Sequence, residues 1–238
     1  MGESLLEIRS VSVRYKDFIA VEDVSLQVEA GEIVSLVGLN GAGKTTLMNA
    51  VVGLQRPREG RIFFRGEDIT GLPTDQIVAR GLTLVPQGGR CFNTLSVQDN
   101  LLMGSYPKGA RKQARQELER VYELFPMLAE KKKCPVGTLS GGQRQMVAIG
   151  RALMGRPSCL IFDEISLGLA PAVINDIYRR ILRINESDKT AVILIEQDMQ
   201  RALRASSRFY VMLKGKVVMS GLSDEIDVES LKNKYFGI

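Results

Sequence analysis

The chain has 238 residues, of which 45% are hydrophobic and 25% charged, and its formal net charge is +5 without any histidine. This composition is ordinary for a soluble globular protein, no segment approaches the roughly 18 apolar residues of a membrane-spanning helix, and the first residues lack a basic-then-apolar leader. We therefore expect a soluble, unexported protein. Its positive charge is spread along the chain and does not distinguish between an anionic ligand, a nucleic acid and an anionic membrane surface as the binding partner.

The first elements in chain order are strands. Alternating apolar and polar residues predict strands at 5–15 and 21–32, and the segment 61–69 predicts a third. Together they indicate an antiparallel flap ahead of a parallel core. Tyr15 lies near the end of the first strand, where an exposed aromatic ring can stack on an adenine. Simple packing is the commoner role of a tyrosine at a strand end.

A strand, a glycine-rich turn and a helix follow one another between Glu32 and Gly53. Residues 33–37 form an apolar run that is typical of a central parallel strand. Gly38-x-x-x-x-Gly43-Lys44-Thr45 then fits the P-loop pattern, in which backbone N–H groups and a helix N-terminus cradle phosphates. We expect Lys44 to contact the β- and γ-phosphates and Thr45 to bind Mg²⁺. The helix is expected to bury Leu47, Ala50, Val51 and Leu54.

The middle of the chain changes from strands to helices. We expect a short helix at 75–80, capped by Thr74, and then a core strand at 81–87 that leaves Gln87 at its carboxyl end, where α/β proteins bind ligands. Residues 88–138 show no strand pattern and predict a helical insertion. Its lysine runs fit solvated faces better than a nucleic-acid site, because no aromatic residues interleave them. One helix, at 110–125, is expected to end before Pro126 and to bury Leu118, Val121, Tyr122 and Phe125.

Two polar motifs occupy the next part of the chain. In LSGGQ, at 139–143, Ser140 can cap a helix and two glycines leave its first N–H groups uncovered, which makes a second anion-binding helix end. One triphosphate seldom needs two such ends, unless the second serves a neighbouring molecule's nucleotide. CLIFDE, at 159–164, is an apolar strand that ends in two acids. Asp163 is suited to hold Mg²⁺ and Glu164 to polarise a water molecule.

The last third of the chain predicts a helix, a core strand and a hairpin. The helix has Pro171 near its first position, and the strand at 191–196 delivers Gln197 to the same carboxyl edge. The hairpin turns at Lys214-Gly215, and the remaining residues, 223–238, are too few for a further domain. The helix is expected to bury Ile174, Ile177, Tyr178, Ile181 and Leu182.

The ordered set GLNGAGKTT, VPQ, LSGGQ and LIFDE is highly specific, and with it the chain resembles the ATPase subunit of ABC transporters over residues 5–238. The resemblance implies a single ABC ATPase domain over 1–238. Its fold would be an α/β P-loop ATPase core with a mainly parallel sheet, an N-terminal antiparallel β flap and a helical subdomain inserted at about 88–155. The implied activity is Mg²⁺-dependent hydrolysis of ATP to ADP and phosphate, coupled to transport.

The resemblance also assigns roles to individual residues. The implied catalytic residues are Lys44, Gln87, Glu164 and Gln197. Those that would bind the nucleotide within the chain are Tyr15, Gly38, Asn40, Gly41, Ala42, Gly43, Lys44, Thr45 and Thr46. The signature that would close over a partner's γ-phosphate is Ser140, Gly141, Gly142 and Gln143. Mg²⁺ would be held by Thr45, Gln87 and Asp163.

Within the family, the chain is similar to the short ATPases of branched-chain amino-acid and urea/amide importers, as LFPML, MVAIGRALM, SLGLAP and IEQDM indicate. Three positions depart from the common family pattern: Gln197 replaces a histidine, Ala170 an aspartate and Ile165 a proline. The first two departures also occur in the importer subfamily. The resemblance thus implies import of a small polar solute, foremost branched-chain or related amino acids, by a protein on the cytoplasmic face of the inner membrane.

The implied partners are a second ATPase subunit, membrane permease subunits and, indirectly, an extracytoplasmic solute-binding protein. The second ATPase is either the same chain or a related one, and the resemblance favours the related chain. We also expect residues 88–106 to form much of the groove that receives a cytoplasmic helix of the permease. One alternative is a nucleotide switch acting on DNA or ribosomes, but such relatives usually carry a coiled-coil insertion or a second cassette. The other, a cassette without hydrolysis, is opposed by the intact Lys44, Asp163 and Glu164.

Overall fold

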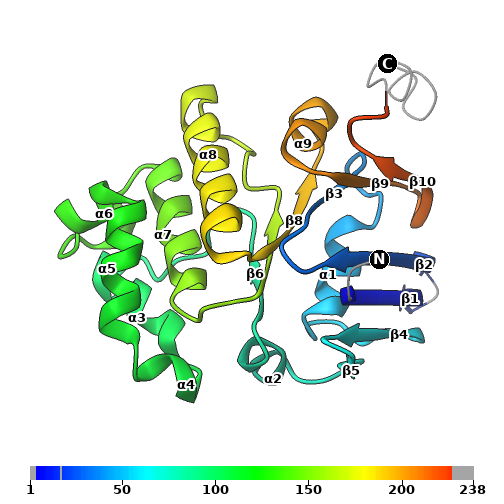
Figure 1. Cartoon of the computed structure of the whole chain (residues 1–238), viewed down its shortest axis with the longest axis horizontal. Coiled ribbons are helices and arrows are strands. Elements are labelled where there is room, and N and C mark those ends of the chain that lie inside the picture. The colour runs from blue at the N-terminus through cyan, green and yellow to red at the C-terminus, as the bar shows by residue number, and fades with distance from the viewer. Residues whose placement is uncertain (1–3, 17, 227–238) are drawn as a thin grey trace.

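The computed structural model describes residues 4–16 and 18–226 and contains two sheets flanked by helices (Figure 1). The smaller sheet has four antiparallel strands in the order β2-β1-β4-β5. These strands are β1 (Ser4–Tyr15), β2 (Phe18–Glu29), β4 (Glu59–Phe64) and β5 (Glu67–Asp68). The expected antiparallel flap is confirmed, with the third predicted strand divided into β4 and β5.

The larger sheet has six strands in the order β10-β9-β3-β8-β7-β6, and only the terminal β9–β10 hairpin is antiparallel. Every residue of β3, β7 and β8 is buried, as expected for strands covered on both faces. The strands are β3 (Ile33–Val37), β6 (Leu82–Val85), β7 (Cys159–Asp163), β8 (Ala191–Glu196), β9 (Arg208–Leu213) and β10 (Lys216–Leu222). The chain is therefore an α/β protein with a mainly parallel core.

Helices α3 to α7 gather at the end of the molecule away from the flap (Figure 1). Between residues 88 and 138 the structure contains helices and a single isolated bridge from Ser96 to Pro135. The α-helices are α1 (Lys44–Val51), α2 (Thr74–Ala79), α3 (Val97–Leu102), α4 (Lys108–Arg111), α5 (Ala114–Leu124), α6 (Pro126–Glu130), α7 (Gly141–Leu153), α8 (Pro171–Asp188) and α9 (Met199–Ala205). Two 3₁₀ turns, η1 (Met103–Ser105) and η2 (Val136–Thr138), connect them. The expected helical insertion is thus present, and its boundaries remain a prediction.

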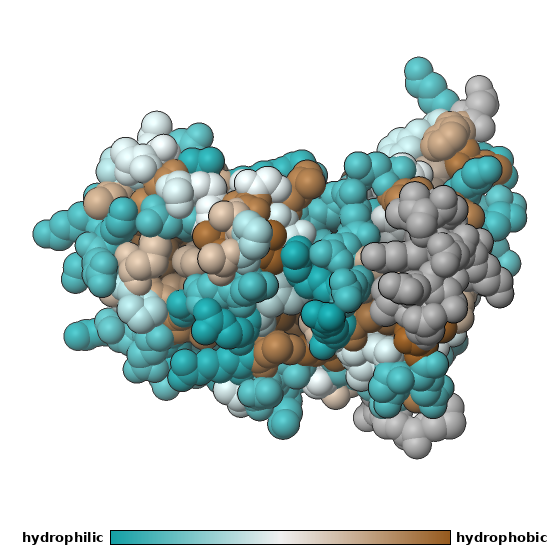
Figure 2. Space-filling model, turned by 90° about the horizontal axis from the view of Figure 1, so that it is seen from above, coloured by the Kyte–Doolittle hydropathy of each residue, from teal (hydrophilic) through white to brown (hydrophobic). Residues whose placement is uncertain are grey.

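Side-chain alternation along the central strands divides the core into two layers. Ile161 and Ile193 face a cluster with α1 and the flap, whereas Leu160 and Leu194 face a cluster with α7 and α8. Cys159 is fully buried in the first cluster. Seen from above, the surface is a patchwork of hydrophilic and hydrophobic residues (Figure 2). None of the helices in residues 4–16 and 18–226 has the length and apolar character needed to span a bilayer.

Four local predictions were wrong. The helix expected at 110–125 is divided, because α4 ends at Arg111, a turn follows at 112–113 and α5 begins at Ala114. Leu54 is 62% exposed, because α1 ends at Val51 and Gly53 turns the chain with a φ of 75°. Thr74 is the first residue of α2 and makes no capping hydrogen bond. Leu182 is 36% exposed and Ile184 is buried in its place, because Leu182 is rotated by about 100° from Ile181. Residues 227–238 of the predicted domain lie outside the described residues.

Tyr122→Phe is expected to stabilise the protein. The Tyr122 hydroxyl is buried on α5 and has no hydrogen-bond partner among the described residues. Removing a buried polar group without a partner is expected to gain about 1 kcal/mol, which raises the melting temperature by about 2–4 °C in a chain of this size. Thermal unfolding of the variant and the wild type checks this, and a lower melting temperature would show that the hydroxyl has a partner.

Candidate functional site

The predicted phosphate loop lies between β3 and α1, and its glycines are required by close backbone contacts. A Cβ atom on Gly38 would collide with the Met212 carbonyl oxygen, and one on Gly43 would lie 2.6 Å from the Ala20 carbonyl oxygen. Gly43 also has a φ of 99°, which L side chains rarely adopt. The Gly215 N–H donates to the Ala42 carbonyl at 3.0 Å. The flap and the β9–β10 hairpin therefore hold the loop at the N-terminus of α1, where helix N–H groups favour an anion.

Lys44 places a buried ammonium at the centre of this loop. Its side chain is 3% exposed, and Nζ donates to the carbonyl oxygens of Gly38 at 2.7 Å and Leu39 at 3.1 Å. Nζ also lies 3.1 Å from Oε1 of Glu164. The positive charge is thus held by the loop and shared with the acid at the end of β7.

Thr45 and Asp163 bring two side-chain oxygen atoms together beside Lys44. Thr45 Oγ1 donates to Asp163 Oδ1 at 3.1 Å. Burial raises the pKa of the Asp163 carboxyl, while the Thr45 hydrogen bond and the charges of Lys44 and Arg90 act in the opposite direction. A hydroxyl and a carboxylate fit Mg²⁺, which prefers oxygen ligands and takes one or two carboxylates together with substrate phosphates.

Gln197, at the carboxyl end of β8, connects the loop to Glu164. Its Nε2 donates to Asn40 Oδ1 at 2.6 Å and to Glu164 Oε2 at 2.9 Å. The helix that follows is capped by Asp198 and not by Gln197, because Asp198 Oδ1 accepts from the Arg201 N–H at 3.1 Å. The structure therefore brings Lys44, Thr45, Asp163, Glu164, Gln197 and Asn40 into one site.

The predicted residues outside the phosphate loop, Tyr15, Gln87 and Ser140–Gln143, make no hydrogen bond to this site among the described residues. Tyr15 is 45% exposed at the end of β1, and Gln87 is exposed after β6. Within residues 4–16 and 18–226, no hydrogen bond joins Gln87 to Asp163 or Glu164. Ser140 caps α7 as predicted, in a capping box with Gln143. No hydrogen bond or ion pair in the same ranges joins Ser140–Gln143 to the phosphate loop.

Sequence reasoning missed two residues near the site. Glu196 is a buried acid at the end of β8, and its position in an otherwise apolar strand, AVILIE, was a signal that could have found it. Arg90 acts electrostatically on Asp163 from the loop after β6. Nothing in the local sequence distinguishes Arg90 from an ordinary loop arginine.

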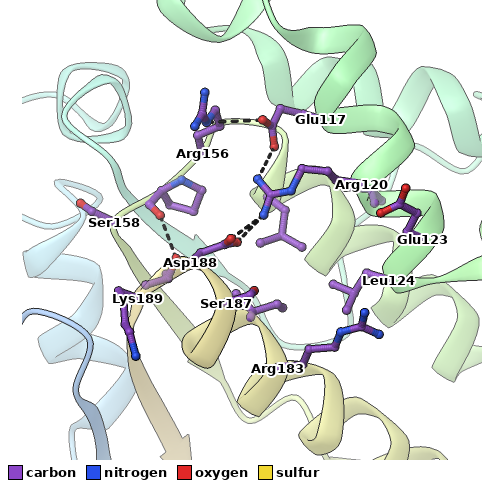
Figure 3. A pocket seen from close by; sticks show the side chains of 15 residues that line it. Glu117, Arg120, Glu123, Leu124, Arg156, Ser158, Arg183, Ser187, Asp188 and Lys189 are labelled. Atoms are coloured by element: carbon purple, nitrogen blue, oxygen red, sulfur yellow. Dashed lines mark hydrogen bonds and ion pairs between the residues drawn. The ribbon is translucent and has the colours of Figure 1, made fainter.

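A large cavity lies away from this site. It measures about 600 Å³ and is bounded by α5, the end of α8 and residues 156–158. Figure 3 shows Arg120 between two acids: it lies 2.6 Å from Asp188 and 3.0 Å from Glu117, which also pairs with Arg156 at 3.4 Å. These ion pairs fasten α5 of the helical insertion to the end of α8. None of the predicted site residues lines this cavity.

Comparisons with known proteins agree with this geometry. The family model described as ABC transporter matches residues 21–166. The chain is 41% identical over 215 residues to the high-affinity branched-chain amino acid transport ATP-binding protein BraG of Pseudomonas aeruginosa, covering 90% of this chain and 91% of that protein. It is 30% identical to BraF of the same organism, which carries the same description, over 95% of this chain and 94% of that protein.

A solved structure extends the likeness to the whole fold. The crystal structure of the ADP conformation of an ATP-binding cassette of an ABC transporter superposes with a TM-score of 0.84 at 26% identity. The alignment covers 97% of this chain and 94% of that one. The chain belongs to the ABC transporter family, as an ATP-binding subunit that hydrolyses ATP.

Proposed function

We propose that this subunit drives an importer of branched-chain or related amino acids from the cytoplasmic face of the inner membrane. The observation that carries the proposal is the position of the Glu164 carboxylate, which lies between Lys44 and Gln197 beside the Thr45–Asp163 pair. The solute is suggested by the names of the relatives BraG and BraF. We infer one ABC ATPase domain over residues 1–238 with its helical subdomain at about 88–155.

In this proposal Lys44 changes partner when ATP binds. Its ammonium gives up the contact with Glu164 and binds the β- and γ-phosphate oxygens instead, because a multiply charged phosphate attracts it more strongly than one carboxylate. Glu164 Oε1 is then free to accept a hydrogen bond from the attacking water, while Gln197 keeps hold of Oε2. Thr45, Asp163 and Gln87 would hold Mg²⁺, which would supply positive charge against the phosphates. Tyr15 stacks on the adenine.

Gln197→Ala is expected to lower kcat by one to two orders of magnitude, about 1.4–2.7 kcal/mol, with little change in KM for ATP. The reason is that the variant loses the donor that fixes Glu164 and keeps every group that holds the phosphates. Steady-state hydrolysis and thermal unfolding on the same preparation measure this effect.

Asp198→Ala is the matched control for Gln197→Ala, because Asp198 caps α9. It should lower the melting temperature and keep kcat per folded molecule. If Gln197→Ala behaves like Asp198→Ala, the contact with Glu164 has no catalytic role.

The separation of the signature from the phosphate loop supports a nucleotide-sandwich dimer. Ser140, Gly141, Gly142 and Gln143 have no hydrogen bond to Gly38–Thr46 among the described residues, so we assign them to the nucleotide of a second ATPase subunit. One organism holds both BraG and BraF, and both are similar to this chain. This pair favours a dimer in which the second ATPase subunit is a related chain rather than another copy of this chain.

We assign the permease contact to a hollow of about 200 Å³ beside α7. Met103, Gly104 and Tyr106, from the predicted segment 88–106, line it together with Arg151 of α7. Met103 and Tyr106 are exposed, which suits an apolar contact with a cytoplasmic helix of the membrane subunit. Cys91 does not line this hollow, and its thiol donates to the Arg144 carbonyl at 3.4 Å. Crosslinking is therefore better started from Tyr106→Cys than from Cys91.

The proposed function is tested by purifying the chain with everything that remains bound to it. We expect membrane permease subunits and a second ATPase, and no nucleic acid. After reconstitution in vesicles, ATP hydrolysis should rise when a solute-binding protein loaded with leucine is added, and should not rise with the unloaded protein. Co-purification with ribosomes or DNA in place of membrane subunits would support the nucleotide switch instead.

A further inference from the structure

The carboxylate of Glu196 is buried at the end of β8, one residue before Gln197. The residue is 2% exposed, and its backbone oxygen accepts from the Gly38 N–H at 3.3 Å. Its two carboxylate oxygens accept from different hydroxyls: Oε1 from Tyr178 at 2.7 Å and Oε2 from Ser166 at 2.9 Å. Burial raises the pKa of Glu196, and these two hydrogen bonds oppose the rise.

A buried acid of this kind is not explained by stability alone. Burying a charge is costly unless it is paired, and apolar residues of similar volume often serve stability as well or better. No ion pair involving Glu196 occurs within residues 4–16 and 18–226, and Arg201 acts on it only electrostatically. The side chains that donate to it are therefore two neutral hydroxyls, which suggests that the position of those hydroxyls matters.

One of the two hydroxyls lies in the loop that follows Glu164, and the other lies on the helix after that loop. Ser166 is in the loop, and Tyr178 is on α8, which the loop leads into. The loop is also attached at its start, because the Glu164 N–H donates to the Ile195 carbonyl at 3.0 Å. Glu164 has a φ of 46°, which is uncommon for a residue other than glycine and persists only where the surroundings enforce it.

The same loop packs against the signature at the start of α7. A Cβ atom on Gly141 would lie 3.4 Å from Leu169 Cδ2, and one on Gly142 would lie 2.5 Å from Val173 Cγ1. Leu169 belongs to the loop and Val173 to the first turn of α8. A shift of the loop would therefore move both Glu164 and the packing of the signature.

We propose that Glu196 is a positioning residue for hydrolysis, whose carboxylate ties Ser166 and Tyr178 to the end of β8 and so holds Glu164 where it polarises the attacking water. The inference rests on the proposed function of Glu164. Glu196 contacts none of the side chains assigned to the phosphates. Loss of its hydrogen bonds thus lowers kcat and leaves KM for ATP unchanged.

The test measures kcat, KM for ATP and melting temperature of variants in the assembled transporter. Ser166→Ala, which removes one donor from a half-buried loop residue, should lower kcat about tenfold, the scale seen when a supporting hydrogen bond is lost. Tyr178→Phe should have a similar effect. Glu196→Gln keeps the shape and one acceptor oxygen, so it should retain more activity than Glu196→Ala.

A double-mutant cycle separates positioning from general destabilisation. If Glu196 acts through Ser166, the double variant Glu196→Ala, Ser166→Ala should be no slower than Glu196→Ala alone. Ser187→Ala and Tyr122→Phe are matched controls, because they remove the same groups away from Glu196. Both should keep the kcat of the wild type.

Three results would overturn the proposal: a Ser166→Ala variant within twofold of the wild-type kcat, full additivity in the cycle, or losses of kcat that only follow the loss of folded protein. Glu164→Gln, measured alongside, separates this failure from that of the proposed function. An inactive Glu164→Gln with an unaffected Ser166→Ala rejects the role of Glu196 alone. An active Glu164→Gln rejects both.

Discussion

Glu164→Gln is expected to lower kcat by about 10²–10⁴-fold in the assembled transporter while ATP affinity is kept. This is the range of a general base, and it corresponds to about 2.7–5.4 kcal/mol of transition-state stabilisation. In the structure, the two carboxylate oxygens of Glu164 have different partners, Lys44 and Gln197. An amide keeps the shape of the side chain and one acceptor oxygen, but it replaces the other oxygen with a donor. The attacking water is then no longer polarised, and the ATP-bound dimer should persist.

Hydrolysis under saturating ATP, an ATP-binding isotherm and the size of the complex in the presence of ATP measure these effects. Glu123→Gln is the matched control, because Glu123 lines the distant cavity beside α5 and α8. The control should hydrolyse ATP like the wild type. Hydrolysis by Glu164→Gln within a few-fold of the wild type would show that another group activates the water.

Gly141→Asp is expected to abolish hydrolysis, by at least about 100-fold, without unfolding the protein. Gly141 is exposed at the first position of α7, and a new Cβ would meet only Leu169 Cδ2, at 3.4 Å. An acid in the first turn of a helix is favourable for stability. If the signature closes over a partner's γ-phosphate, however, the new carboxylate faces a phosphate of like charge, and such a juxtaposition costs several kcal/mol.

The informative comparison is Gly141→Asn, which has almost the same size and no charge. It should lose much less activity than Gly141→Asp, and both variants should bind ATP as isolated chains. Gly142 is unsuitable for this test, because a side chain there would displace Val173. Loss of ATP binding by the isolated Gly141→Asp chain would show that the signature serves the chain's own nucleotide. Normal hydrolysis would show that the signature does not approach a phosphate.

The sequence by itself determined the strands and the helix cap whose formation depends only on residues close together in the chain. The apolar runs of β3 and β7 were found from the sequence because burial on both faces demands uninterrupted apolar strands, and the two acids were found because they end the run of β7. The capping box of Ser140 and Gln143 is likewise a property of four consecutive residues. Helix faces were predicted less well. Periodicity alone does not show where a helix ends, as at Leu54, or how wide its buried stripe is, as at Leu182.

The contacts that give the site its chemistry were decided by the tertiary structure. The order β3-β8-β7 places the ends of three strands side by side, and only this arrangement brings Gln197 to Asn40 and Glu164. Glu196 could be recognised in the sequence as an acid in an apolar strand, but not as the acceptor for Ser166 and Tyr178. A side chain's hydrogen-bond partners depend on which elements pack together, and the sheet order that fixes this packing is not encoded in any single segment.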